Sequence, residues 1–216
     1  MKIIALLPMK ANSERVKGKN FKKFGDKPLF KWTLDTLLSV KEINMIVINT
    51  DAKNILYENG LVKDSRILIR DRDPKICGDL VSMNTIINDD LENIDADIFL
   101  MTHTTNPFLS KKSIESSIDL FKKSLIEKTG DSLFTVNKIQ ESFYNDKVEP
   151  LNHDPNNLVR TQDLEPWFKE NSNLYLFTKN SFQTTKARIG KRPIILETPL
   201  FESTDIDTPD DWSLAE

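Results

Sequence analysis

The chain has 216 residues, of which 38% are hydrophobic and 29% are charged, so its length and composition predict one soluble globular domain with a substantial core. Its formal net charge of −3 argues against a general nucleic-acid-binding protein, because that class needs a broad basic surface, although a few local cations would suffice to bind a nucleotide. Cys77 is the only cysteine, which excludes an intramolecular disulfide and favours a cytoplasmic setting, and we interpret its side chain as a small packing residue.

Apolar runs alternate with amphipathic stretches along the chain, a pattern typical of a sheet covered by helices. The first run, at residues 3–7, is too short for a secretory signal or a membrane span, so we expect a buried strand and no membrane partner. The predicted strands are 3–7, 45–49, 66–69, 98–102, 131–136, 174–178 and 193–196. The predicted helices are 29–40, 52–59, 82–91, 110–124 and 211–215, with Asp51, Ser82 and Ser110 as expected N-caps.

Residues 144–160 interrupt this alternation, because they are polar and contain Pro150 and Pro155, which predicts a loop or an excursion from the main sheet. We therefore expect a single domain over 1–216, with an excursion at approximately 138–172. Short strands that feed helices through polar loops predict an α/β fold with a mostly parallel central sheet flanked by helices. Such sheets bind ligands at the carboxyl ends of their strands, so the chemistry is expected in the loops that follow the first four strands.

The loop at residues 8–20 follows the first strand and carries four cationic residues between Lys10 and Lys19. Binding a triphosphate takes cations, hydroxyls and free amides in one place, and Lys10, Ser13, Arg15 and Lys19 offer such a set. A solvated lysine-rich loop is the alternative, but the position after a buried strand favours phosphate binding. Neither GxxxxGK[ST] nor GxGxxG occurs, so side chains would have to hold most of the phosphate charge.

The same loop, Pro8-Met9-Lys10-Ala11-Asn12-Ser13-Glu14-Arg15-Val16-Lys17-Gly18-Lys19-Asn20, resembles the N-terminal signature of the acylneuraminate cytidylyltransferases, the CMP-sialic acid synthetase family. It is also similar to the related KDO cytidylyltransferases. The resemblance implies a Rossmann-like nucleotide-diphospho-sugar transferase fold, with Lys10 standing where the family has an arginine. The nucleotide-binding residues that it implies are Lys10, Asn12, Ser13, Arg15, Lys19, Arg72 and Ser82. For Arg72 the alternative is a surface arginine, and for Ser82 it is a helix cap, which is compatible with ligand binding.

On the sugar side, the segment 102–109 resembles the family's Leu-Gln-Pro-Thr-Ser-Pro-Leu-Arg, with His103 in place of a sugar-contacting glutamine and Leu109 in place of an arginine. The sugar-binding residues that the resemblance implies are His103, Thr104, Arg160, Gln162 and Tyr175. A structural histidine is the alternative for His103, whose expected mid-range pKa would also allow proton transfer from the attacking hydroxyl. The family's excursion reaches into the site of a second subunit, so we expect a homodimer.

Near the C-terminus, Asp205 and Asp207 stand two residues apart and would face the same side of an extended segment, with Ile206 turned inward. Two carboxylates suit Mg²⁺ or Mn²⁺. The alternative is an acidic cluster at the entry to the last helix. The family's Asp-Ile-Asp-Thr is unchanged here, which favours the metal site.

The sequence thus predicts a cytidylyltransferase that transfers CMP from CTP to the anomeric hydroxyl of a 2-keto sugar acid, a sialic acid or related nonulosonic acid, and releases pyrophosphate. Lys10, Lys19 and Asp207 are the predicted catalytic residues. Two alternatives stay open: a KDO-type sugar cytidylyltransferase, and a degenerate homologue that binds nucleotides without turnover, suggested by the departures at Lys10, His103, Leu109 and Thr161.

Overall fold

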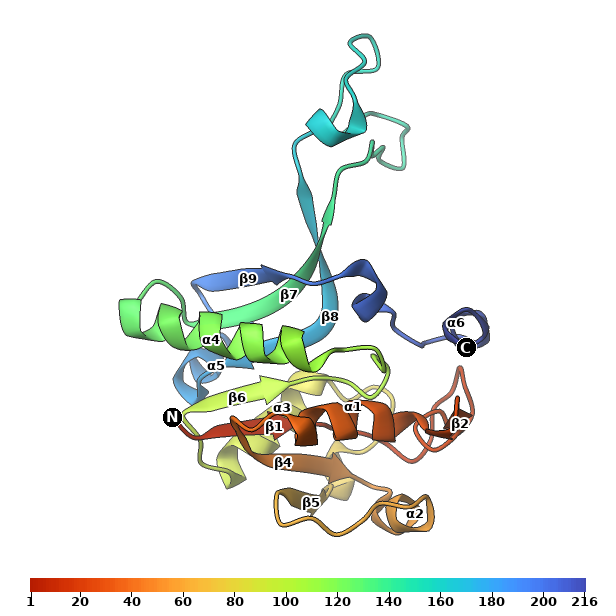
Figure 1. The fold of residues 1–216 in the computed structure, drawn as a ribbon, viewed down its shortest axis with the longest axis vertical. Coiled ribbons are helices and arrows are strands. Elements are labelled where there is room, and N and C mark those ends of the chain that lie inside the picture. Colours follow the sequence, from red (N-terminus) through yellow and green to blue (C-terminus); the bar gives the residue numbers. More distant parts are fainter.

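A seven-stranded sheet, ordered β5-β4-β1-β6-β8-β7-β9, forms the centre of the computed structural model, which describes residues 1–216 (Figure 1). Its strands are β1 (Ile3–Leu6), β4 (Ile43–Thr50), β5 (Ile67–Asp71), β6 (Ile98–Met101), β7 (Ser132–Ile139), β8 (Trp167–Phe177) and β9 (Pro193–Glu197). All neighbouring strands are parallel except β8, which is antiparallel to both β6 and β7. The predicted α/β class with a mostly parallel sheet is confirmed. A small hairpin, β2 (Lys23–Phe24) with β3 (Lys27–Pro28), stands apart.

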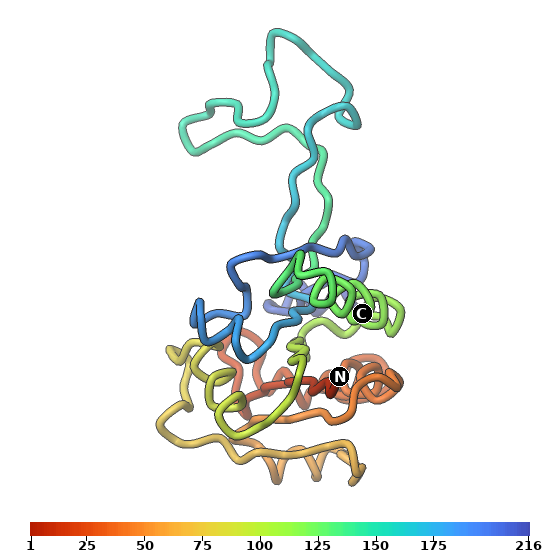
Figure 2. Tube along the Cα trace, turned by 90° about the vertical axis from the view of Figure 1, so that its left-hand side faces the viewer, coloured from red at the N-terminus to blue at the C-terminus, as the bar shows by residue number.

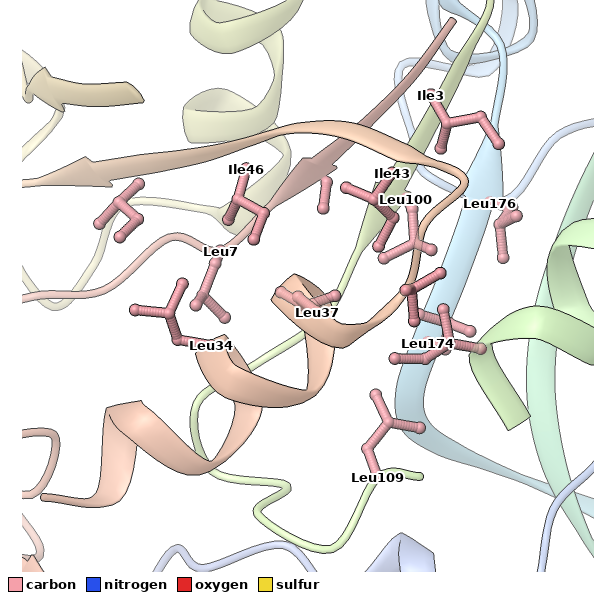
Figure 3. Close-up of a cluster of buried hydrophobic side chains, with 14 of the residues drawn as sticks. Ile3, Leu7, Leu34, Leu37, Ile43, Ile46, Leu100, Leu109, Leu174 and Leu176 are labelled. Carbon is pink, nitrogen blue, oxygen red and sulfur yellow. The ribbon is translucent and has the colours of Figure 1, made fainter. Parts of the chain in front are cut away.

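Helices cover both faces of the sheet. The α-helices are α1 (Leu29–Ser39), α2 (Lys53–Glu58), α3 (Met83–Asn93), α4 (Lys111–Glu127), α5 (Lys179–Thr185) and α6 (Pro209–Ala215), and three 3₁₀ turns span Pro74–Ile76, Thr161–Asp163 and Leu200–Ser203. The larger core cluster joins α1 and α4 to one face, and a second cluster joins α3 and α5 to the other. Figure 3 shows Leu34 and Leu37 of α1 facing Leu7 and Ile46 in the larger cluster.

The buried strand β1 shows why the sequence folds this way. Successive side chains of a strand point to opposite faces, so Ile3 and Ala5 pack under α1 and α4 while Ile4 and Leu6 pack under α3 and α5. A strand that is covered on both faces must be apolar throughout, and all four residues are fully buried. The central strand is thereby fixed, and its carboxyl end delivers the polar loop that follows.

The helix caps confirm two predictions and correct a third. The hydroxyl of Ser82 accepts the backbone N–H of Asn84 at 3.3 Å, and that of Ser110 accepts the N–H of Ser113 at 3.1 Å. Asp51 is not the cap of α2: the cap position is Ala52, and Asp51 Oδ1 instead accepts the backbone N–H of Ala11 at 2.7 Å. The carboxylate therefore anchors the loop after β1 and not a helix.

Between β7 and β8 the chain leaves the sheet and forms an arm, residues 140–166, that projects away from the rest of the molecule (Figures 1 and 2). The outer halves of β7 and β8 continue to pair as far as Ile139 and Trp167, so the arm stands on a two-stranded ribbon. At its base the Gln140 amide donates to the carbonyls of Gln162 and Leu164 at 3.0 and 2.9 Å.

No helix in the protein combines the length and the apolar character that crossing a membrane requires.

Candidate active site

A cavity of about 350 Å³ opens at the carboxyl edge of the sheet, where the loops after β1, β5 and β6 meet the segment before α6. Three of the four loops in which the sequence predicted the chemistry line this cavity, those after β1, β5 and β6, and the loop after β4 does not. The predicted site residues that line the cavity are Lys10, Ser13, Arg15, Lys19, Arg72, His103, Thr104 and Asp207.

Three hydrogen bonds hold the loop after β1 in place. Asp51 accepts the N–H of Ala11, as described above. Asn20, which the sequence analysis gave no role, donates from its amide to the carbonyl of Lys10 at 2.8 Å. Its Oδ1 accepts the hydroxyl of Thr104 at 2.7 Å and so ties the loop to the segment after β6. Preorganisation of this kind keeps the cationic side chains at the rim of the cavity without a ligand.

Asp207 is the carboxylate around which these cations gather. Lys19 Nζ lies 2.9 Å from its Oδ1 and also donates to the Ile206 carbonyl at 2.6 Å, while Arg15 Nη2 lies 3.0 Å from its Oδ2. Partial burial opposes ionisation of Asp207, but the contacts with Lys19 and Arg15 outweigh it, so its pKa is lowered. The carboxylate is thus ionised and its two neighbours are charged.

Lys10 makes a corresponding pair across the cavity with Asp79, whose pKa is lowered by the hydrogen bond from the ammonium group. Both carboxylates therefore balance cations that would otherwise repel one another. A triphosphate entering the cavity could accept hydrogen bonds from the same ammonium and guanidinium groups, because phosphate oxygens are strong acceptors for them.

Arg72 is a buried part of the cavity wall, and most of its N–H groups donate hydrogen bonds to the protein itself. Its Nε donates to Asn49 Oδ1 at 2.9 Å, and its Nη2 donates to the carbonyls of Met9 and Asn49 at 2.9 and 2.7 Å. Burial lowers its pKa. The guanidinium therefore joins the ends of β1 and β4, and Nη1 is the group left to face a ligand.

His103 lines the cavity next to Thr104 and Thr105, the two hydroxyl residues that follow it after β6. Burial, together with the charge of Arg188, lowers the pKa of His103 to about 4, so the expectation of a mid-range pKa is wrong. The imidazole is neutral at pH 7 and is a weak base. Arg188, which the sequence analysis missed, lies in a loop after α5 among several other cations and carried no motif.

Tyr175 packs against Arg188, which in turn contacts His103. Its ring is fully buried on β8, the Arg188 guanidinium lies 3.8 Å above the ring centroid, and its hydroxyl donates to Glu170 and, at 3.3 Å, to Ser172. Burial raises the pKa of Tyr175 to about 12, so the phenol keeps its proton. The side chain does not line the cavity, and it contacts the site through Arg188.

The remaining predicted residues lie elsewhere. Asn12 is exposed on the first loop, and Ser82 caps α3 between two cavity-lining residues. Arg160 and Gln162 lie on the arm, where the Arg160 guanidinium is paired with Asp163 at 2.7 Å. Within one chain the structure does not bring these two to the cavity.

The expectation that Asp205 and Asp207 face the same space is wrong: Asp207 lines the main cavity, and Asp205 lines a neighbouring pocket together with Ser203 and Asp211. Ile206 between them is fully buried, as expected. The Oδ1 atom of Asp205 is buried without a hydrogen-bond partner, and burial, reinforced by the charge of Asp207, raises its pKa. Carboxylate oxygens are the donors that a divalent cation prefers, and the unpaired Oδ1 of Asp205 is available to one, whereas both oxygens of Asp207 are paired with Lys19 and Arg15.

Nowhere in the protein do three or more His, Cys, Asp or Glu side chains come together in a way that could hold a metal ion. Two carboxylates alone would leave most positions around Mg²⁺ to water and phosphate oxygens, which is the usual arrangement of that ion at phosphate sites.

The chain is similar to known proteins over nearly its whole length. A family model described as Cytidylyltransferase matches residues 4–204. The chain is 29% identical to the CMP-N,N'-diacetyllegionaminic acid synthase of Legionella pneumophila, over all of this chain and 95% of that protein. It is 24% identical to the N-acylneuraminate cytidylyltransferase of Oncorhynchus mykiss, over 99% of this chain but only 49% of that longer protein.

The fold has a match among solved structures as well. The structure of a CMP:2-keto-3-deoxy-manno-octonic acid synthetase complexed with CTP superposes with a TM-score of 0.67 at 14% identity, covering 99% of this chain and 96% of that one. That likeness shows a shared fold. The family match, which covers nearly the whole chain, shows that this protein belongs to the cytidylyltransferase family.

Proposed function

We propose that the protein is a CMP–sugar-acid synthetase, which transfers CMP from CTP to the anomeric hydroxyl of a nonulosonic acid and releases pyrophosphate. The observation that carries the proposal is the set of cations around the cavity, Lys10, Arg15 and Lys19, held by the loop after β1 in a member of the cytidylyltransferase family. The sugar class is supported by the full-length likeness to a legionaminic acid synthase.

In the proposed reaction the anomeric oxygen attacks the α-phosphorus of CTP and releases its proton to water, while the bond from that phosphorus to the oxygen that bridges to the β-phosphate breaks and pyrophosphate leaves. Positioning and neutralisation of charge supply most of the acceleration in phosphoryl and nucleotidyl transfer. Lys19 and Arg15 are fixed against Asp207 and so keep their positions when the triphosphate arrives. Lys10 exchanges its partner Asp79 for phosphate oxygens.

The proposed cofactor is Mg²⁺, with Mn²⁺ as a substitute, held by Asp207 and by Asp205 with its unpaired Oδ1. When bound it would neutralise negative charge on the triphosphate. For the protein, binding would relieve the cost of burying the Asp205 carboxylate, which has no cationic partner of its own.

The proposed assembly is a homodimer in which the arm of each subunit reaches the cavity of the other. Two features support it: the arm stands clear of its own domain, and it exposes apolar side chains, among them Val148 and Leu158, which are 76% and 87% exposed. Arg160 and Gln162 would then serve the partner's sugar-acid site.

The test is pyrophosphate release with CTP and Mg²⁺ across a panel of neuraminic, legionaminic, pseudaminic, KDN and KDO acids. We expect release with a nine-carbon acid, and release with the KDO acid alone would replace the proposal by the eight-carbon alternative. Binding of CTP without turnover of any acid would establish the binding-only alternative. Absence of CTP binding would refute the proposed role of the first loop.

A matched pair of variants tests the cations themselves. Lys19→Ala removes a buried ammonium group from the cavity, and kcat/KM should fall by roughly 100-fold or more. Lys17→Ala removes an exposed ammonium group from the same loop outside the cavity and should leave kcat/KM unchanged. Equal kcat/KM values for the two variants would contradict the proposed triphosphate site.

A further inference from the structure

Arg188 occupies a constrained position behind His103, which lines the cavity. Its guanidinium carbon lies 3.8 Å from the centroid of the Tyr175 ring, and its Nη2 is 3.8 Å from the Glu170 carboxylate. Its Nη1 reaches His103 Nε2 at 3.3 Å. Three fixed neighbours thus define the orientation of a planar group that can only donate hydrogen bonds.

The loop that carries Arg188 is itself held on both sides. The Thr185 hydroxyl lies 3.1 Å from the carbonyls of both Ala187 and Ile189, the two neighbours of Arg188 in the chain. Farther along, the N–H of Gly190 donates to the Ser132 hydroxyl at 2.8 Å. The guanidinium is therefore supported by backbone contacts as well as by its own side-chain contacts.

This geometry decides which ring nitrogen of His103 carries the proton. Arginine has no acceptor, so the nitrogen facing it, Nε2, must be the acceptor of the pair. A neutral imidazole with an accepting Nε2 carries its hydrogen on Nδ1. Nδ1 makes no hydrogen bond within the protein, and His103 lines the cavity.

We infer that Arg188 is a positioning residue that fixes His103 as the Nδ1–H tautomer, so that His103 presents a constant hydrogen-bond donor to an oxygen acceptor of the sugar acid. In this arrangement His103 binds substrate and does not remove a proton from it. The identity of the ligand rests on the proposed function, whereas the tautomer is a property of the protein alone and can be measured without any substrate.

The tautomer is accessible to nitrogen-15 NMR, because the protein has only two histidines, His103 and His153, and His153→Gln assigns the two spectra. At pH 7 we expect His103 to show a protonated Nδ1 and an unprotonated Nε2. In Arg188→Met the pattern should shift to a mixture containing the Nε2–H form. Arg192→Met, a change to a nearby arginine that donates to the Lys128 carbonyl outside the site, should leave it unchanged. An Nε2–H form in the wild type, or no change in Arg188→Met, would overturn the inference.

Steady-state kinetics provides the second readout. Arg188→Met should raise KM for the sugar acid by roughly ten-fold, the effect of one misdirected hydrogen bond, and leave KM for CTP within about two-fold. In a His103→Gln background, whose amide donor needs no tautomer, the same change should have little further effect. Equal effects in both backgrounds would mean that Arg188 acts independently of His103.

Arg188→Lys, whose ammonium group can only donate hydrogen bonds, serves if Arg188→Met does not fold. It should retain the Nδ1–H tautomer, and loss of that tautomer in a folded Arg188→Lys protein would contradict the role of the hydrogen bond. If no acid on the panel is turned over, the proposed function fails while the NMR result still decides the tautomer.

Discussion

At the scale of single residues, His103 shows how strongly its surroundings determine its chemistry. In the unfolded chain a histidine has a pKa of about 6.5, whereas burial and the charge of Arg188 lower the pKa of His103 to about 4 in the folded protein. Lys19 also disfavours the protonated form, and Asp207 partly offsets both cations. Between these two pKa values the unfolded state binds a proton that the folded state does not.

The sign of the effect on stability follows from this difference. The contribution of His103 is fully present above pH of about 6.5 and is lost as the pH falls toward 4. His103→Gln removes the titration, so the wild type should lose roughly 2–3 kcal/mol more stability than the variant between these limits. Urea unfolding at a series of pH values measures the difference. Parallel pH profiles for the two proteins would show that His103 has an ordinary pKa.

Whether a site residue could be predicted from the sequence depends on whether its role is visible in its own stretch of the chain. Lys10, Arg15 and Lys19 could be predicted because they lie in one short loop after a strand, and the charge needed for phosphate is visible in the sequence. Asn20 and Arg188 could not, because each acts on a residue about 84 or 85 positions away, Thr104 and His103. Such pairings are created by the fold and leave no spacing pattern.

At the scale of elements, Ser110 and Asp51 were both predicted as helix N-caps, but they have different roles in the structure. Ser110 is a true N-cap, so Ser110→Ala should cost about 1 kcal/mol and lower Tm by roughly 2–4 °C without changing KM for CTP. Asp51 holds the loop after β1 through the Ala11 N–H, so Asp51→Ala should raise KM for CTP by roughly three- to ten-fold with a smaller change in Tm. Thermal melts and CTP kinetics on both variants check the contrast, and a reversed pattern would restore Asp51 as a cap.

The strands and helices that the sequence predicted well are those with a continuous apolar face. β1 and α4 lie within a few residues of their expected bounds because burial on the sheet requires their pattern. β8 begins at Trp167, seven residues before the predicted start, because its outer half pairs only with β7 and is exposed, so its composition need not be apolar. α5 was missed because Phe182 is its only buried large hydrophobe.

At the scale of the whole molecule, the arm makes the proposed assembly testable by complementation. Lys19→Ala would disable a subunit's own cavity, and Arg160→Ala would disable the arm that it lends to its partner. When the two inactive proteins are mixed and allowed to exchange subunits, half the dimers carry one intact site, so about a quarter of wild-type activity should return. Two copies of either variant alone should stay inactive.

If activity does not return in a mixture that is shown to contain mixed dimers, Arg160 contributes to the active site of its own subunit. Analytical ultracentrifugation of Leu158→Glu gives an independent check, because a charge on this exposed arm residue should weaken association. A dimer of unchanged affinity would locate the interface elsewhere.

The place of β8 in the sheet has a consequence for how the chain is made. β8 lies between β6 and β7, yet it follows both in the chain and ends at Phe177. Until that residue has left the ribosome, β6 keeps one unpaired edge formed by Ile98, Phe99, Leu100 and Met101, and β7 has no neighbour in the sheet. A nascent or truncated chain that stops before Phe177 therefore displays an apolar strand edge, which is a template for aggregation and a target for chaperones.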